Sequence, residues 1–473
     1  MQPIHHIGTL LVQTYTRMVP IIDESKHYIY TICMKRDLEH KLREWKDSPR
    51  RKPLLLKGAR QTGKTWLLKS FGESAFKDLA YFNFEEDRNL DQLFEGAIDP
   101  ARLIRQLSLA RGKAIVAGES LTFFDEIQES NRALNALKYF HEEAPEYHIV
   151  AAGSLLGILL SRPASFPVGK VDFLELHPLS FPEFLVAAGH AELRQMIEEI
   201  RTVEPIPELF HERFLELLKT YYMTGGMPEP VKVFLETNDV GGARRIQQDI
   251  ITSYRLDFAR HTPTSEIPRL NELWRTIPTQ LARENRRFRY RAISERARGR
   301  EYADVLSWLE GAGLILRARR VTVPRFPLVG YEDAESFKVY LLDVGLLGAL
   351  SELPPEMLLQ GIRLFTEFNG AFVENYVAQE MAATSAGGLH YWTSEGKAEV
   401  DFVRASEGMV FPLEVKAGLN PKSQSLRVYD AKFSPPVLSR TSLLNLRKDG
   451  RVINFPLYAI SQFPRLAVPG GRT

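Results

Sequence analysis

Apolar and polar positions along this chain follow patterns that divide it into regions with different expected structures. From residue 37 to about residue 185, short apolar runs alternate with stretches in which apolar residues recur every three or four positions. Strands that alternate with helices predict a parallel sheet covered by helices on both faces. From about residue 186 to residue 261 the pattern is almost wholly helical. This stretch is expected to form a helical lid over the sheet.

Regular patterning begins at Met34. Leu38, Leu42 and Trp45 follow it at the spacing of one helix face. The apolar run at residues 7–12 is too short for a secretory signal and lacks the basic leader of one. We therefore expect residues 1–33 to be an extension outside the core, and Met34 to be the natural start.

Arginine becomes dense after the helical region. A helical stretch at residues 300–310 and an alternating basic stretch at residues 314–321 follow this cluster. Two helices and a basic hairpin outline a winged helix-turn-helix, which would bind DNA. The same arginines could instead pair with acids in a packing module, and the sequence favours neither interpretation. The cluster comprises Arg283, Arg286, Arg287, Arg289, Arg291, Arg296, Arg298 and Arg300, and the expected wing carries Arg317, Arg319 and Arg320.

The clearest chemical signal is the run at residues 58–65, which matches GxxxxGK[ST] and follows an apolar strand. In such a phosphate-binding loop, backbone N–H groups and the lysine contact phosphates, and the final hydroxyl binds Mg²⁺. The next residues, 66–71, read as a helix whose N-terminal end favours an anion. The expected nucleotide-binding residues are Gly58, Ala59, Arg60, Gln61, Thr62, Gly63, Lys64 and Thr65.

A second part of the nucleotide site is predicted downstream. The apolar run at residues 121–124 ends in Asp125 and Glu126, as a buried parallel strand does when its carboxylates emerge at the carboxyl edge of a sheet. Asp125 is expected to hold Mg²⁺ with Thr65, and Glu126 to act as the general base. A third strand, residues 147–152, leads to Ser154, which is expected to lie near the γ-phosphate.

A second group of acids occurs near the C-terminus. Asp401 lies within an apolar strand, and Glu414 and Lys416 share one face of the next strand by alternation. Together with Glu374 from an upstream helix, the acids Asp401 and Glu414 would hold Mg²⁺, while Lys416 would orient or deprotonate water. This is the layout of a PD-(D/E)xK nuclease, although such a fold can persist without cleavage activity.

Composition narrows the class of protein only slightly. Of the 473 residues, 44% are hydrophobic and 25% are charged, with a formal net charge of +2. A disordered chain is excluded, and any basic surface must be local. A single cysteine, Cys33, fits a reducing cytoplasm and excludes a disulfide framework. With no apolar run of membrane-spanning length, the chain is not expected to bind or cross a membrane.

From Met34 to near the C-terminus, the chain resembles the prokaryotic ATPases that join an AAA-type domain to a C-terminal domain of unknown function, DUF4143. The resemblance implies ATP binding and a restriction-endonuclease-like tail, but it implies no substrate. Residues 1–33 lie outside it. The matching motifs are residues 56–65, 124–128, 151–154, 225–228, 340–347, 399–402 and 413–416.

Taken together, these patterns predict an α/β protein of four parts and an extension. Two classes of function fit it: an ATPase coupled to handling or cutting DNA, or an ATP-controlled switch with an inactive nuclease fold. The oligomeric state is left open. The expected domains are a P-loop ATPase core at 34–185, a helical lid at 186–265, a winged helix at 266–335 and a nuclease-like domain at 336–473, after the extension at 1–33.

Overall fold

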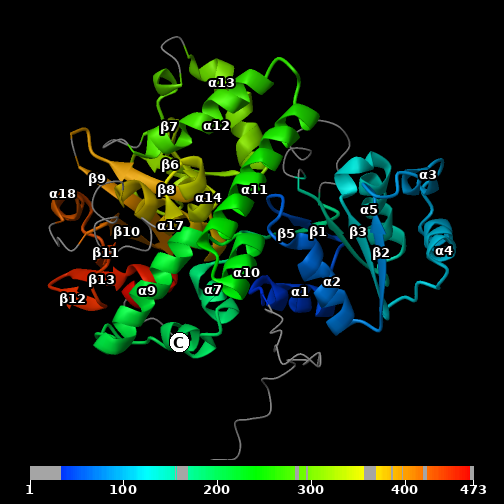
Figure 1. Cartoon of the computed structure of the whole chain (residues 1–473), viewed down its shortest axis with the longest axis horizontal. Coiled ribbons are helices and arrows are strands. Elements are labelled where there is room, and N and C mark those ends of the chain that lie inside the picture. Colours follow the sequence, from blue (N-terminus) through cyan, green and yellow to red (C-terminus); the bar gives the residue numbers. More distant parts are fainter. Residues whose placement is uncertain are drawn as a thin grey trace, which may run out of the picture.

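The computed structural model describes residues 34–154, 156, 169–282, 287–293, 297–355, 369–384, 387–396, 398–418 and 423–468. The expected extension at 1–33 lies outside this description, as do Arg283, Arg286 and Arg296. Figure 1 shows two sheets, one near the N-terminus in blue to cyan and one near the C-terminus in yellow to red, with green helices between them.

The N-terminal sheet has five strands in the order β2-β3-β4-β1-β5, and all its pairs are parallel. Two separate hydrophobic clusters pack on it. The expected parallel sheet is therefore confirmed. Its strands are β1 (Leu54–Lys57), β2 (Asp78–Asn83), β3 (Ser120–Asp125), β4 (His148–Ala152) and β5 (Asp172–Glu175), and its helices are α1 (Leu38–Asp47), α2 (Lys64–Ala75), α3 (Leu90–Leu93), α4 (Pro100–Arg111) and α5 (Asn131–Glu143).

Helices dominate the next part of the chain. α7 begins with a capping box, in which the Ser180 hydroxyl accepts from Glu183 N and the Glu183 carboxylate accepts from Ser180 N. α11 is the longest helix described and packs on α9, α10 and α14. The helices are α7 (Phe181–Ala187), α8 (Ala191–Glu198), α9 (Glu208–Thr224), α10 (Pro228–Thr237), α11 (Val240–His261), α12 (Ile267–Leu281) and α13 (Gly299–Gly311).

The C-terminal sheet has eight strands in the order β12-β13-β11-β10-β9-β8-β6-β7. Its strands are β6 (Ile315–Val321), β7 (Glu332–Leu341), β8 (Leu389–Thr393), β9 (Glu399–Ser406), β10 (Met409–Val415), β11 (Leu438–Ser442), β12 (Arg447–Asp449) and β13 (Val452–Pro456); its helices are α14 (Val344–Leu350), α17 (Asn369–Thr384) and α18 (Gln424–Phe433).

The predicted wing belongs to this sheet. β6 pairs antiparallel with β7 on one side and parallel with β8 on the other. A boundary between residues 335 and 336 would cut β7, so the expected separation of a winged helix from the C-terminal domain is wrong. Two helices and a basic hairpin do occur in the expected order, but long-range strand pairing, which local sequence does not reveal, joins the hairpin to the C-terminal strands.

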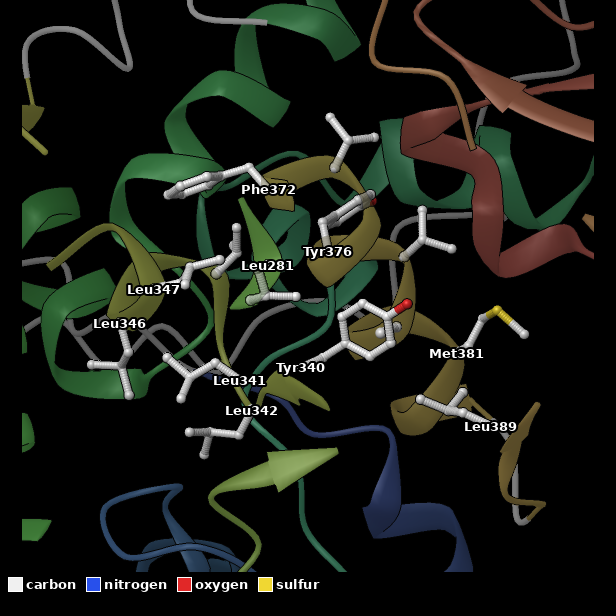
Figure 2. Close-up of a cluster of buried hydrophobic side chains, with 14 of the residues drawn as sticks. Leu281, Tyr340, Leu341, Leu342, Leu346, Leu347, Phe372, Tyr376, Met381 and Leu389 are labelled. Carbon is white, nitrogen blue, oxygen red and sulfur yellow. The ribbon is translucent and has the colours of Figure 1, made fainter. Parts of the chain in front are cut away.

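One continuous hydrophobic core connects the helices with the C-terminal sheet. In Figure 2, Tyr340 and Leu341 of β7 lie beside Leu346 and Leu347 of α14 and Tyr376 of α17. These residues are fully buried. The regions expected as lid, winged helix and nuclease-like domain therefore share a core, and the N-terminal sheet, the one expected to form the AAA domain and called the AAA sheet below, has its own.

Candidate nucleotide site and C-terminal acidic cluster

The phosphate-binding loop lies between β1 and α2. Gly58 and Gly63 have φ values of 151° and 92°, a region that disfavours side chains. A Cβ at Gly58 would lie 2.3 Å from the Leu176 carbonyl oxygen, so only glycine fits there. Thr62 Oγ1 donates to Ala59 O at 2.9 Å and tightens the turn. The chain thus closes back on itself over residues 58–63, directly before the N-terminus of α2.

Lys64 is buried at the start of α2. Its Nζ donates to the carbonyl oxygens of Gly58 and Ala59 at 3.0 and 2.8 Å. Burial lowers the pKa of this ammonium to about 8. A buried cation held mainly by backbone carbonyls gains strongly from an anion, so this position suits a phosphate group.

Asp125 ends β3 next to the loop, as the sequence predicted. Its Oδ2 accepts from Thr65 Oγ1 at 2.8 Å and from Tyr81 Oη at 3.0 Å. A carboxylate and a hydroxyl this close could share Mg²⁺, an ion that proteins usually bind through one or two carboxylates together with substrate phosphates. The sequence analysis missed Tyr81, because the sequence does not show that the strand that carries Tyr81 pairs with the strand that ends at Asp125.

Glu126 follows in a left-handed conformation, with φ of 50°. Its Oε2 accepts from Gln128 Nε2 at 2.5 Å. Burial raises the pKa of Glu126. A half-buried carboxylate beside a phosphate-binding loop could serve as a general base.

Elements from outside the AAA sheet also hold the loop. Arg36, just before α1, donates to Thr62 O at 2.9 Å and to Glu183 Oε1 at 3.1 Å. From α11, Tyr254 Oη donates to Arg60 O at 3.0 Å, and Asp257 accepts from Arg60 Nη1 at 2.9 Å. The sequence analysis did not identify Arg36 or Asp257, because their contacts with Glu183 and Arg60 span 147 and 197 residues.

Ser154 lies after β4 and lines a small cavity with Arg60, Tyr254 and Asp257. Its expected position near a γ-phosphate stays a prediction. The turn after α13 also reaches the loop, because a Cβ at Gly313 would lie 3.3 Å from Ala59 N. The nucleotide site is therefore bordered by the AAA sheet, by α11 and by the start of the C-terminal sheet.

The C-terminal acids lie near one another, but a lysine lies among them. Lys338 of β7 is fully buried, and its Nζ is 2.9 Å from Glu374 Oε1, 2.5 Å from Glu399 Oε1 and 3.8 Å from Asp401 Oδ1. Tyr340 Oη also donates to Glu374. The sequence analysis missed Lys338, since it is one basic residue in a strand of ordinary pattern.

The other two predicted residues of this cluster pair with each other. Lys416 Nζ is 2.8 Å from Glu414 Oε1, as strand alternation suggested. Asp401 Oδ2 accepts from Val415 N at 2.8 Å. Within the part of the chain that the structure describes, no three Asp, Glu, His or Cys side chains are grouped to hold a metal ion. The metal group expected from Glu374, Asp401 and Glu414 stays a prediction, and the Lys338 ammonium lies beside two of its acids.

The expected wing arginines are ion-paired. Arg317 and Arg319 both contact Glu310 of α13, at 2.9 and 3.3 Å, and Arg320 contacts Asp333 at 3.3 Å. By contrast, Arg289, Arg291, Arg298 and Arg300 are exposed and have no ion pair with another described residue. The basic cluster therefore divides into a paired set on β6 and an exposed set before and at the start of α13.

Models of known protein families match the N-terminal and C-terminal regions of the chain. Residues 50–185 match an AAA domain, and residues 369–459 match the domain of unknown function DUF4143. The chain therefore contains an AAA domain joined to a DUF4143 domain. Between them, residues 215–357 match a second domain of unknown function, DUF8612. No curated protein matches the chain.

Solved structures give weaker likenesses. A Walker-type ATPase of Pyrococcus abyssi is 16% identical, with a TM-score of 0.42, over 67% of this chain and 96% of that one. The Orc1 protein of Aeropyrum pernix, solved with DNA, is 16% identical with a TM-score of 0.30 over 68% and 93% of the two chains. Cdc6p of Pyrobaculum aerophilum is 12% identical with a TM-score of 0.26 over 72% and 100%. None of the described helices is long and apolar enough to span a membrane.

Proposed function

We propose that this protein binds ATP with Mg²⁺ and hydrolyses it at the loop of residues 58–65. The observation that carries the proposal is the juxtaposition of buried Lys64 with the Thr65–Asp125 hydrogen bond of 2.8 Å. Lys64 would contact the β and γ oxygens, Thr65 and Asp125 would hold Mg²⁺, and Glu126 would take a proton from water. Charge neutralisation and positioning provide most of the catalysis in phosphoryl transfer.

Replacing Lys64 tests this proposal. Lys64→Ala should weaken ATP binding by about 1.5–3 kcal/mol, the range for a hydrogen bond to a charged group, or roughly 10- to 150-fold in Kd. Calorimetry with Mg²⁺ and ATP measures the effect, and Lys77→Ala, at an exposed ion pair with Glu119 away from the loop, is the control. Binding of ATP by Lys64→Ala as tight as by the parent protein would refute the phosphate-loop assignment.

We further propose that the C-terminal domain acts in binding or assembly, as in the switch interpretation, rather than in cleavage. Lys338 supports this, because its ammonium lies where a nuclease would need a metal ion. Contacts of α11 and Gly313 with the phosphate-binding loop also support a link between ATP and this domain. ATP binding would then alter how the shared core rests against the AAA sheet.

DNA is a second candidate partner, and the exposed arginines near α13 favour it. Replacing Arg289, Arg291 and Arg298 with Ala should reduce DNA affinity. The slope of log K against log salt should become shallower by about 0.9 for each phosphate that the variant no longer neutralises. Exposed Arg88 and Arg105 of the AAA domain provide the control pair. An unchanged affinity and slope would show that these arginines do not bind nucleic acid.

A further inference from the structure

One buried polar atom beside the nucleotide site has no partner. Gln128 lies in the single turn Ile127–Glu129 that follows Glu126. Its Nε2 donates to the Glu126 carboxylate, but its Oε1 is buried without a hydrogen-bond partner among the described residues. Nearly all buried polar atoms in proteins are hydrogen-bonded, so an unpaired carbonyl oxygen at this place requires a reason.

The orientation of this amide follows from its neighbour. An ionised carboxylate only accepts hydrogen bonds, so the nitrogen of Gln128 must face Glu126 and the oxygen must face away. The oxygen then faces Gly153, where an added Cβ would lie 2.2 Å from it. Glycine at position 153 therefore leaves the room that the Gln128 carbonyl oxygen occupies, between Glu126 and the turn that carries Ser154.

We propose that Gln128 is a positioning residue for ATP hydrolysis, which holds the Glu126 carboxylate with its amide N–H while its buried Oε1 packs against Gly153 and fixes the amide in this orientation. The proposal rests on the proposed ATPase function. In the step, the water oxygen bonds to the γ-phosphorus and the bond from this phosphorus to the β–γ bridging oxygen breaks, giving ADP and phosphate. One water proton passes to Glu126 and later to phosphate or solvent, and the Gln128 amide N–H keeps the Glu126 carboxylate in place for this transfer.

Holding the Glu126 carboxylate in place would explain both the hydrogen bond from Gln128 and the glycine at position 153. Gln128 contacts Glu126 from the same strand end, so the donor and the base are held in one short segment of backbone. Gly153 comes directly after β4, the neighbouring strand of β3, so the space for the carbonyl oxygen is set by the sheet itself. A general base that is held in this way needs little reorganisation during the reaction.

The test compares Gln128→Leu, which keeps the shape but removes both polar atoms, with Gln128→Glu, which keeps the size and places a second carboxylate against Glu126. We expect kcat to fall about 10- to 100-fold in Gln128→Leu, less than the roughly 10²- to 10⁴-fold that a general base itself contributes, with the Kd for Mg²⁺–ATP changed less than about twofold. Gln128→Glu should not restore kcat. Gly153→Ala should lower kcat similarly, because its Cβ displaces the carbonyl oxygen.

A double variant separates positioning from general damage. If Gln128 acts through Glu126, adding Gln128→Leu to Glu126→Gln should cause little further loss, whereas independent structural effects would add. Full kcat in Gln128→Leu, or full additivity in the double variant, would overturn the proposal. Failure of the ATPase function is a separate result, because the parent protein itself would then show no Mg²⁺-dependent turnover.

Discussion

The AAA site and the C-terminal acidic cluster both collect carboxylates, yet different groups face those carboxylates. Asp125 accepts from two hydroxyl groups, and the nearby Lys64 donates to backbone carbonyls. In the C-terminal cluster, Lys338 forms ion pairs with Glu374, Glu399 and Asp401. The first arrangement leaves both a carboxylate and an ammonium with capacity for a bound ion pair such as Mg²⁺ and phosphate. The second already holds a cation of its own, since a fully buried ammonium is stable only beside its counter-charges.

The largest expected difference between the two sites concerns turnover. Glu126→Gln should bind ATP but lower kcat by about 10²- to 10⁴-fold, because the general base is lost. Asp401→Asn should leave kcat within about twofold, since Asp401 accepts from Val415 N in a different sheet from the loop. Steady-state assays of phosphate release measure both. A comparable loss of kcat in Asp401→Asn would show that the C-terminal cluster also takes part in ATP hydrolysis, and the proposed difference between the two sites would be wrong.

The next effect is on stability. Lys338→Met should destabilise the fold by about 3–5 kcal/mol, because removing one partner leaves buried carboxylates without compensation. Lys77→Met, which breaks an exposed pair with Glu119, should cost less than about 1 kcal/mol. Denaturant titration measures both free energies of unfolding. Should Mg²⁺ restore the stability of Lys338→Met but not alter that of the parent protein, the lysine would indeed replace a metal ion.

An effect that depends on pH sharpens the contrast along one helix. Glu380 of α17, like Glu374, is buried, but it accepts from Phe181 N at 2.7 Å instead of pairing with a lysine. Burial raises the pKa of Glu380 to about 8. Between its usual pKa and this value the unfolded chain holds fewer protons, so stability should fall as pH rises, by at most about 1.4 kcal/mol per pH unit from this group.

Glu380→Gln isolates that contribution. Its free energy of unfolding relative to the parent protein should increase from about pH 5 to about pH 8 and then level off, because glutamine cannot ionise. Thermal or urea unfolding at matched pH values measures the difference. A constant difference across this range would mean that Glu380 stays ionised in the fold, despite its burial.

The comparison also shows how far sequence patterns reach. Residues 58–65 and 121–126 predicted the loop and its acid because both depend on local backbone and on a strand of regular pattern. Strand alternation likewise placed Glu414 beside Lys416. Lys338 could not be predicted as a partner of Glu374, since α17 and β7 meet only through packing. β6 was misplaced because it pairs with β8, a strand that lies far along the chain beyond α14 and α17.

The support of the phosphate-binding loop bears on how such a chain can be recombined during evolution. The AAA match covers residues 50–185, but Arg36 precedes it, and Tyr254, Asp257 and Gly313 follow it. A gene fusion that exchanged only the matched segment would bring in a phosphate-binding loop that had evolved with other contact residues outside the segment. Transfer of the matched segment alone is therefore expected to cost the loop these contacts, unless the helices and the sheet that follow are transferred with it.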